Sequence, residues 1–246
     1  MGPKSSTLFH FTKNSNTLEL ILKTGFWPRY SLEDIGWLGY SKNEYMAYPM
    51  VCFCDIPLSR ISEHVEFYGN YGLGMSKEWA QTKGLNPVNY IVKNNNLKDT
   101  FRGIDTLATK FNDEGLKKEL WSYYRRLVAF TKPTTGNMLV DGNLIQKDFY
   151  QESEWRFIPM HENVKTHLRR STFEETNNII EANEMTQKHC MLKIEPKDIK
   201  YIFVKTDNDI ANIINFIQKE LDNYPGVDLK ILMSRVVSLE SLQKDI

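Results

Sequence analysis

The chain has 246 residues, of which 41% are hydrophobic, 25% charged and 12% aromatic. These values are typical of a globular protein with a sizeable core, and they exclude a disordered, collagen-like or coiled-coil chain. Basic and acidic residues each number 31, so the formal net charge is 0, and overall charge gives no evidence for unspecific binding to nucleic acid or membranes.

Cysteine content and hydropathy bear on the cellular compartment. Three cysteines, Cys52, Cys54 and Cys190, are too few for a disulfide framework. No apolar run has the length of a signal peptide or of a membrane span. The sequence therefore predicts a cytoplasmic protein without a membrane segment. We interpret the close pair Cys52 and Cys54 as packing residues and expect no metal site.

The first elements are a strand and a capped helix. Residues 7–12 (TLFHFT) predict a strand, and the capping-box pattern of Asn16 and Glu19 predicts a helix that ends at Gly25. The aromatic and polar stretch 27–49 lacks a sustained period and predicts an ordered loop. Five elements follow: a buried strand over 49–55, a helix over 59–68, a strand over 72–75, a helix from Ser76 to Gly84, and a strand over 89–92.

The second half alternates helices and strands. A turn at 94–96 precedes two helices over 97–130, broken near Gly115, since apolar residues recur there at helical spacing. The remaining expected elements are a strand over 155–159, a helix-containing insertion over 160–189, a strand over 199–205, a helix over 209–221, a strand over 229–233, and a short terminal helix. The pattern predicts one α+β domain over 1–246, with a helical insertion near 97–130.

Several residues of the first half are candidates for ligand binding. His10 shares its expected strand with two phenylalanines, so it is either a core histidine or a hydrogen-bonding partner for a ribose hydroxyl. Tyr68 and Tyr71 flank Gly69 and precede Gly72. These aromatics either pack in the core or lie against a planar ligand, which a neighbouring glycine lets approach closely.

Two acidic residues of the second half are candidates for catalysis. The spacing of Glu152 and Glu154 puts both carboxylates on one side of an extended chain, next to Arg156. They are either a solvated strand face with a surface ion pair or a catalytic pair. A carboxylate beside a sugar stabilises the positive charge that develops at the anomeric carbon when a leaving group departs.

An ordered set of segments resembles the AbiGi-type abortive-infection domain: LFHFT (8–12), MVCFCDIPLS (50–59), YGNYGLGMSKEW (68–79), LNPVNYIV (85–92) and ESEWRFIP (152–159). Through it the chain resembles ADP-ribosyltransferases with a His, Tyr and Glu triad, found among phage-defence toxins of the CmdT and DarT groups. The resemblance implies a split mixed β-sheet core with peripheral helices, NAD as the substrate, and ADP-ribose transfer to a macromolecule.

The resemblance also implies roles for single residues. His10 and Thr12 would bind the adenosine ribose of NAD, and Tyr71 or Tyr68 would stack on nicotinamide. Glu154 would hold the nicotinamide ribose and stabilise the oxocarbenium ion. Glu152 would orient or activate the acceptor, and Arg156 would fix Glu154 or a phosphate.

The implied function is that of an NAD-dependent ADP-ribosyltransferase toxin in a toxin–antitoxin system against phage. The acceptor is RNA or protein, with RNA favoured, and the implied partners are a cognate antitoxin and, optionally, a chaperone. A local basic patch around Arg125 and Arg126, or around Arg169 and Arg170, would serve an RNA acceptor. The alternative is a noncatalytic antitoxin or regulatory binding module of an abortive-infection system.

Overall fold

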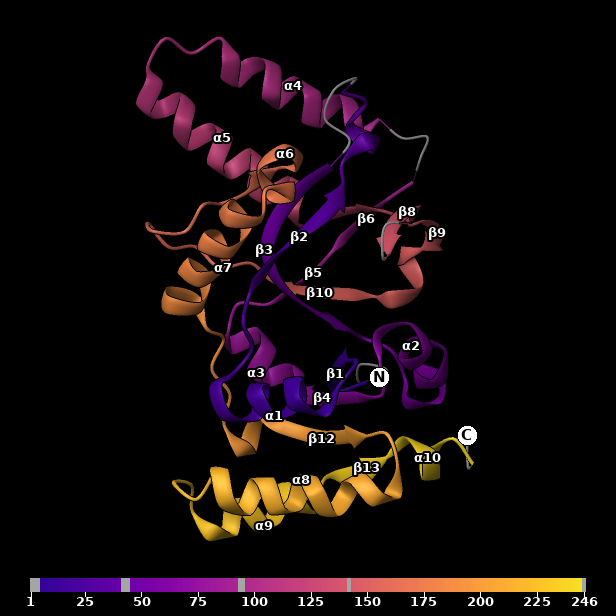
Figure 1. Cartoon of the computed structure of the whole chain (residues 1–246). Coiled ribbons are helices and arrows are strands. Elements are labelled where there is room, and N and C mark those ends of the chain that lie inside the picture. Colours follow the sequence, from indigo (N-terminus) through magenta and orange to yellow (C-terminus); the bar gives the residue numbers. More distant parts are fainter. Residues whose placement is uncertain (1–4, 41–44, 93–95, 141–142, 245–246) are drawn as a thin grey trace. The chain divides into compact units, whose positions relative to one another are not determined.

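The computed structural model describes residues 5–40, 45–92, 96–140 and 143–244 (Figure 1). Its internal contacts divide the chain into two compact units. The first unit comprises Met1–Trp27, Cys52–Leu85 and Met191–Ile246, and the second comprises Pro28–Val51 and Asn86–Cys190. Both units interleave in the sequence, so each depends on pairings between residues that are far apart along the chain.

The first unit is built on a mixed sheet in the order β13-β12-β4-β1. The central pair is antiparallel, with register running from Thr7 opposite Ser76 to Thr12 opposite Tyr71, and β12 pairs with β13 in parallel. The strands are β1 (Thr7–Thr12), β4 (Tyr71–Ser76), β12 (Ile199–Val204) and β13 (Val236–Ser238). Alternating apolar residues of these strands supply a core that includes Phe9, Phe11 and Phe203.

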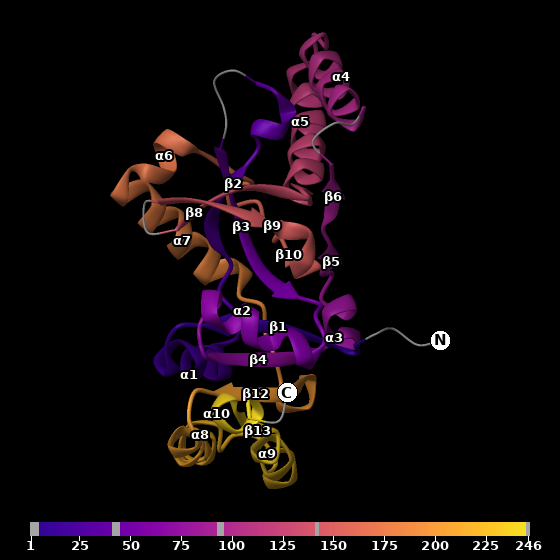
Figure 2. The same cartoon turned by 90° about the vertical axis from the view of Figure 1, so that its right-hand side faces the viewer.

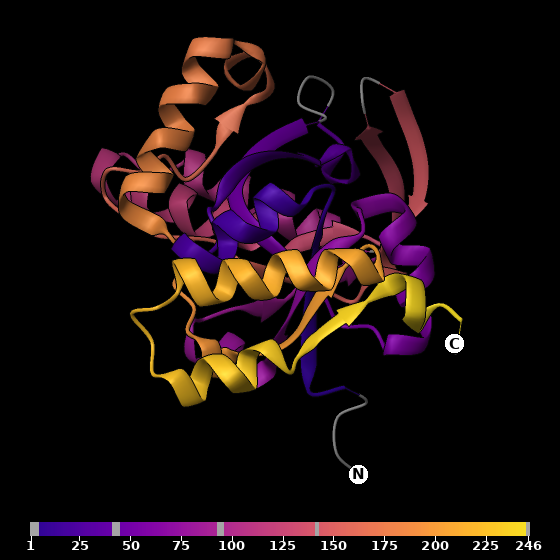
Figure 3. The same cartoon turned by 60° about the horizontal axis from the view of Figure 1, so that its bottom comes forward.

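Six α-helices of the described part of the first unit flank this sheet. They are α1 (Ser15–Thr24), α2 (Ile61–Tyr68), α3 (Lys77–Thr82), α8 (Asp207–Glu220), α9 (Gly226–Met233) and α10 (Leu239–Leu242). Figure 3 brings the orange and yellow α8 and α9 to the front, where they lie side by side next to β12 and β13. Ile213 and Ile217 form the buried stripe of α8. Short 3-10 turns precede α2 (η2, Leu58–Arg60) and β12 (η4, Pro196–Asp198).

The second unit joins short strands to two pairs of helices. Strand β3 (Tyr45–Cys54), which belongs to this unit up to Val51, pairs antiparallel with β2 (Arg29–Asp34) and with β11 (Leu168–Arg169). The other strand pairs are β10 (Glu154–Phe157) with β5 (Asn86–Pro87), β6 (Asn89–Ile91) with β7 (Thr131–Pro133), and β8 (Thr135–Val140) with β9 (Asn143–Asp148). Two 3-10 turns, η1 (Gly36–Leu38) and η3 (Phe149–Glu152), complete this set.

The helices of the second unit are arranged as α4 (Leu97–Thr109) against α5 (Glu114–Ala129), and α6 (Arg170–Glu174) against α7 (Thr176–Cys190). Figure 2 shows α4 and α5 as a hairpin. Asp113 caps α5 by accepting a hydrogen bond from the Leu116 amide. None of the helices in the described ranges combines the length and the hydropathy that a bilayer span requires.

The predicted α+β class and most predicted elements are confirmed, including the 7–12 strand, the two helices within 97–130, the 199–205 strand and the 209–221 helix. The turn predicted at 94–96 falls mainly outside the described residues. The single-domain count stays a prediction, since the contacts fall into two units. The ADP-ribosyltransferase-like form of the sheet likewise stays a prediction.

Four local predictions are wrong. The stretch 27–49 is not a loop, because β2 pairs along β3 over six residue pairs. Residues 229–233 belong to helix α9, and the last strand is β13. The N-cap of α1 is Asn14, whose side chain accepts from the Thr17 amide, rather than Asn16. The break between α4 and α5 lies at 110–113, and Gly115 is already inside α5.

Candidate functional site

His10, the first predicted ligand-binding residue, lies partly buried on β1 of the first unit. Its Nδ1 is 2.8 Å from the carbonyl oxygen of Cys52 and donates to it, since a carbonyl only accepts. Its ring centroid lies 5.0 Å from that of Phe26 and 5.5 Å from that of Phe53. Burial lowers the pKa of His10, and the hydrogen bond to Cys52 only partly offsets this. His10 is therefore a neutral imidazole with a fixed orientation.

Thr12 and Tyr71 lie opposite each other in the β1–β4 pair. The Tyr71 hydroxyl donates to Asp209 at 3.3 Å, and burial followed by the charge of Asp209 raises the pKa of Tyr71. Tyr68 ends helix α2, where its ring centroid lies 4.4 Å from that of His64. Of the two tyrosines, Tyr71 is thus the one paired with the predicted Thr12, and Tyr68 packs against the hydrophobic core.

Glu152, Glu154 and Arg156 lie in the second unit. The prediction that both carboxylates share one side of an extended chain is wrong, because Ser153 has φ of 44° and Glu152 ends the 3-10 turn η3. The two carboxylates nevertheless meet at one ammonium group. Lys132 Nζ lies 2.9 Å from Glu154 Oε2 and 3.6 Å from Glu152 Oε2.

Glu154 is the centre of a buried charge network. Glu154 is 5% exposed, and Arg156 beside it is 0% exposed. Arg156 donates from Nε to Glu154 Oε1 at 2.7 Å and from Nη2 to Glu154 Oε2 at 3.2 Å. Such a two-pronged pair fixes both planar groups. The alternative of a solvated strand face with a surface ion pair is therefore wrong: the guanidinium is buried and donates to several acceptors.

Further residues complete the network. Arg156 also donates to the carbonyl of Ala129 and to Glu33 Oε2, each at 2.6 Å. Lys147 Nζ lies 2.5 Å from Glu152 Oε1. The six charged groups are three carboxylates (Glu33, Glu152, Glu154) and three cations (Lys132, Lys147, Arg156), so their formal charges cancel. Removing any one member of such a buried network destabilises the protein, because the charge of its partner would be left without a counter-charge.

The ammonium of Lys132 is held in its charged form. Burial by itself lowers the pKa of Lys132, but the carboxylates of Glu154, Glu33 and Glu152 outweigh it and hold the pKa above its ordinary value. The same ammonium lies 4.2 Å from the ring centroid of Phe149, a cation–π contact. Lys132 therefore acts as a permanent positive charge rather than as a proton donor or acceptor near neutral pH.

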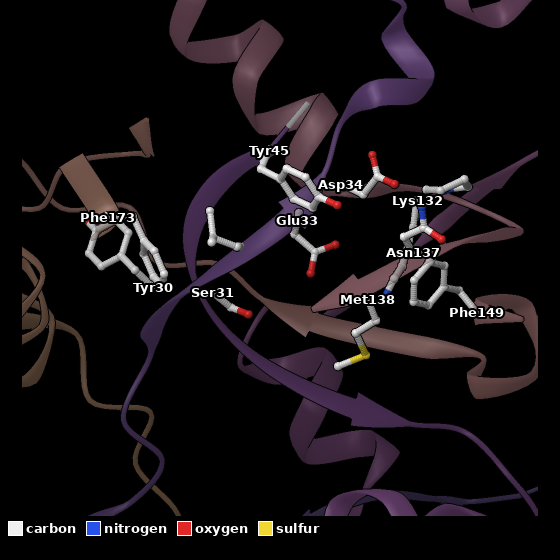
Figure 4. Close-up of a pocket in the computed structure, with 12 residues that line it drawn as sticks. Tyr30, Ser31, Glu33, Asp34, Tyr45, Lys132, Asn137, Met138, Phe149 and Phe173 are labelled. Atoms are coloured by element: carbon white, nitrogen blue, oxygen red, sulfur yellow. The ribbon is translucent and has the colours of Figure 1, made fainter. Parts of the chain in front are cut away.

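A cavity of about 260 Å³ lies next to this network (Figure 4). Glu33 and Lys132 line it, and Figure 4 shows Tyr45 beside Glu33 and Phe149 beside Lys132. The other residues of the lining are Tyr30, Ser31, Leu32, Asp34, Pro133, Asn137, Met138 and Phe173. The carboxylates of Glu33 and Asp34 and the ammonium of Lys132 thus line a partly aromatic cavity, which suits a polar ligand.

Sequence reasoning missed Glu33, Lys132 and Lys147. Glu33 falls in the stretch that lacked any period, and Lys132 belongs to a three-residue strand. The nearest signal in the sequence was the pair Glu152 and Glu154, which need buried counter-charges if they are not exposed. Within the part of the chain that the structure describes, no group of three or more His, Cys, Asp or Glu side chains is arranged to hold a metal ion.

Comparison with known proteins gives two matches. The family model described as "Putative abortive phage resistance protein AbiGi, antitoxin" matches residues 24–205. The abortive phage resistance protein AbiGi of Lactococcus lactis subsp. cremoris is 28% identical over 250 residues, covering 89% of this chain and 99% of that protein. No solved structure matches the chain. Because the family model spans most of the sequence, the chain belongs to the AbiGi abortive phage resistance family.

Proposed function

We propose that this chain is a noncatalytic, antitoxin-type binding protein of an abortive-infection system, which neutralises a partner protein of the same system. The observation that carries the proposal is that the carboxylate of Glu154 is already paired with buried cations. Both of its oxygens accept from buried cations, Arg156 and Lys132. Three of its about four lone-pair sites are thus taken by charge-assisted bonds, which are among the strongest hydrogen bonds in proteins, and the residue is 5% exposed, so a ribose hydroxyl has little access to it. This geometry favours a structural role for Glu154.

A second feature favours protein binding. Helices α4 and α5 pack against each other, yet they and the short link between them carry large apolar side chains that are 41% to 58% exposed. The residues are Leu97, Leu107, Phe111, Leu116, Tyr123 and Leu127, which we call the hairpin apolar set. Large apolar side chains exposed along one pair of helices make this pair a candidate interaction surface. The family description supplies the occupant, since an antitoxin neutralises a toxin.

The proposal is tested by growth and by enzymology on the same chain. The chain is expressed alone, the product of the gene next to its own is expressed alone, and both are expressed together, each from an inducible promoter. We expect growth to stop only when the neighbouring product is expressed alone, and a stable complex to form when both are present. Growth arrest by this chain alone would overturn the proposal.

A second candidate is the NAD-dependent ADP-ribosyltransferase toxin. One specific observation favours it: Thr12 lies opposite Tyr71, and His10 on the same strand has a fixed, neutral imidazole. This is the set of side chains that the resemblance assigns to NAD. On this candidate Glu154 and Glu152 would serve catalysis, and Arg156 would fix Glu154. RNA or protein would accept the ADP-ribose.

Labelled NAD separates the two candidates. The purified chain is incubated with labelled NAD and total cell extract, and parallel samples are treated with protease or nuclease. The binding-protein proposal expects intact NAD and no label. Transfer of label by the wild type, lost in His10→Ala while the variant stays folded, would establish the transferase instead. Sensitivity of the label to nuclease or to protease would then identify the acceptor.

A further inference from the structure

The second unit contains another cavity, of about 210 Å³, whose lining shares no residue with the one beside Glu33 and Lys132. Its walls come from η1 and its flanks, β3, α4, α5 and β11. The residues that matter are two arginines, Arg125 and Arg169, and three aromatic side chains, Tyr40, Tyr48 and Trp121. Positive charge and flat rings are therefore gathered around one hollow.

The two arginines are near each other and lack a carboxylate partner. Arg125 is half-buried, with its guanidinium carbon 4.8 Å from the ring centroid of Trp121. Neither guanidinium forms an ion pair with a carboxylate in the described ranges, although Asp105 attracts Arg125 from the cavity wall. Burial lowers the pKa of Arg125, and the positive charge of Arg169 adds to that lowering. An anion placed between the two groups would relieve this repulsion.

The aromatic wall offers an unused donor. The indole N–H of Trp121 is buried and has no hydrogen-bond partner among the described residues. Buried donors of this kind call for an acceptor, because leaving one unsatisfied costs free energy. Tyr40 is already committed, since its hydroxyl donates to Asp105 at 2.6 Å. The cavity therefore presents the two guanidinium groups and the carboxylate of Asp105 to its occupant, with aromatic rings in its wall.

We propose that this cavity binds a nucleoside monophosphate, with the phosphate on Arg125 and Arg169 and the base against the aromatic wall. Guanidinium groups bind phosphate oxygens in a two-pronged geometry, and aromatic rings stack on bases. At about 210 Å³ the cavity is smaller than the roughly 300–1,000 Å³ of drug-sized pockets, so we place only the base and sugar inside it. The phosphate lies at the rim, where Arg169 is exposed. This proposal does not depend on the antitoxin proposal, because nucleotide binding is measured on the purified chain without its partner.

The test is calorimetric titration of the purified full chain at fixed ionic strength. The probes are AMP, GMP, CMP and UMP, with inorganic phosphate and the four nucleosides as separate arms. We expect at least one monophosphate to bind about tenfold more tightly than phosphate or its own nucleoside, because charge and stacking act together. Quenching of tryptophan fluorescence provides a second readout, since Trp121 lines the cavity.

Variants locate the site. Arg169→Gln removes an exposed rim charge without disturbing the core and is expected to weaken binding about tenfold or more. Arg170→Gln is the matched control: it is the next residue, equally exposed, and pairs with Glu174 instead of lining the cavity. Its affinity should stay within about twofold of the wild type. Trp121→Phe keeps an aromatic ring but offers a smaller surface to the base, so it should fold and bind more weakly.

Four results would overturn the proposal. Three of them are no binding by any of the four monophosphates, equal affinity for inorganic phosphate, and wild-type affinity in Arg169→Gln. The fourth comes from one more titration, with a single-stranded RNA oligonucleotide, and is tenfold tighter binding of this oligonucleotide than of every monophosphate. The last result would assign the two arginines to a nucleic acid strand instead of a free nucleotide. Each is read directly from the titrations, whether or not the chain acts as an antitoxin.

Discussion

The guanidinium of Arg156 donates two hydrogen bonds to the carboxylate of Glu154, from Nε at 2.7 Å and from Nη2 at 3.2 Å. The two residues face the same side of β10, two positions apart, which brings their side chains together. Neither is exposed to solvent beyond 5%. The pair therefore holds the second unit together from within, and a substitution at either end has consequences for stability before any for catalysis.

Glu154→Gln should lower the free energy of unfolding by about 3 to 5 kcal/mol, because Arg156 and Lys132 would lose a buried counter-charge. Urea denaturation followed by circular dichroism measures the change. The matched control is Glu174→Gln, which removes an exposed pair with Arg170 and should cost less than about 1 kcal/mol. Unchanged stability of Glu154→Gln would contradict the structural role and return Glu154 to the list of catalytic candidates.

Gly72→Ala should destabilise the first unit, by about 1 to 3 kcal/mol. A Cβ at this position would lie 2.5 Å from Cδ1 of Phe11 and 2.6 Å from the carbonyl oxygen of His10. The backbone oxygen belongs to the paired strand and has little freedom to move away. Thermal or urea denaturation of the variant provides the measurement.

Gly103→Ala serves as the opposite control. Gly103 lies within α4, and a Cβ there would meet nothing within 4 Å. Alanine favours a helix over glycine by about 1 kcal/mol, so this variant should be slightly more stable than the wild type. Equally small changes in stability for Gly72→Ala and Gly103→Ala would contradict the close approach of β1 to β4 at Gly72.

Stability should fall as pH decreases below about 6.5, in part through His167. Burial, then the charges of Arg125 and Arg169, lower the pKa of His167 to about 4 in the folded state. The unfolded chain, with a pKa of about 6.5, binds the proton first, so acid favours unfolding. Between pH 7.5 and 5.0 this contributes about 1 to 2 kcal/mol, allowing for the part of the ring that solvent reaches.

Urea denaturation at the two pH values measures this loss. His167→Gln, which cannot titrate, should show a smaller difference between pH 7.5 and 5.0 than the wild type. An identical pH dependence in both proteins would refute the assignment to His167.

The hairpin apolar set should matter for the partner and little for folding. Leu107→Ser and Leu127→Ser, at positions 58% and 49% exposed, should weaken the complex with the neighbouring gene product about tenfold together. Val227→Ser, at a position 68% exposed on α9, is the control. Titration of the purified partner gives the affinities. Full affinity of the double variant would place the binding surface elsewhere.

The sequence by itself determined the elements whose signals are local. The alternation in 7–12 defined β1, the apolar spacing within 97–130 defined α4 and α5, and Ser76 and Gly84 marked the two ends of the α3 segment. Capping and periodicity depend on residues a few positions apart, so they can be recognised from the sequence alone. The first strand and the start of the α3 segment also belong to the stretches that carried the resemblance to the AbiGi family, which the comparisons confirm.

Only the tertiary structure decided what surrounds the predicted glutamates. Glu33 reaches Arg156 from 123 positions away, and Lys132 reaches Glu154 from 22. Strand β2, which carries Glu33, has no periodicity of its own and forms because β3 offers it a paired edge. Whether a carboxylate is free or neutralised depends on such distant partners and on burial. Local sequence patterns encode neither, so the sequence alone left Glu154 either as part of a solvated strand face or as a catalytic candidate.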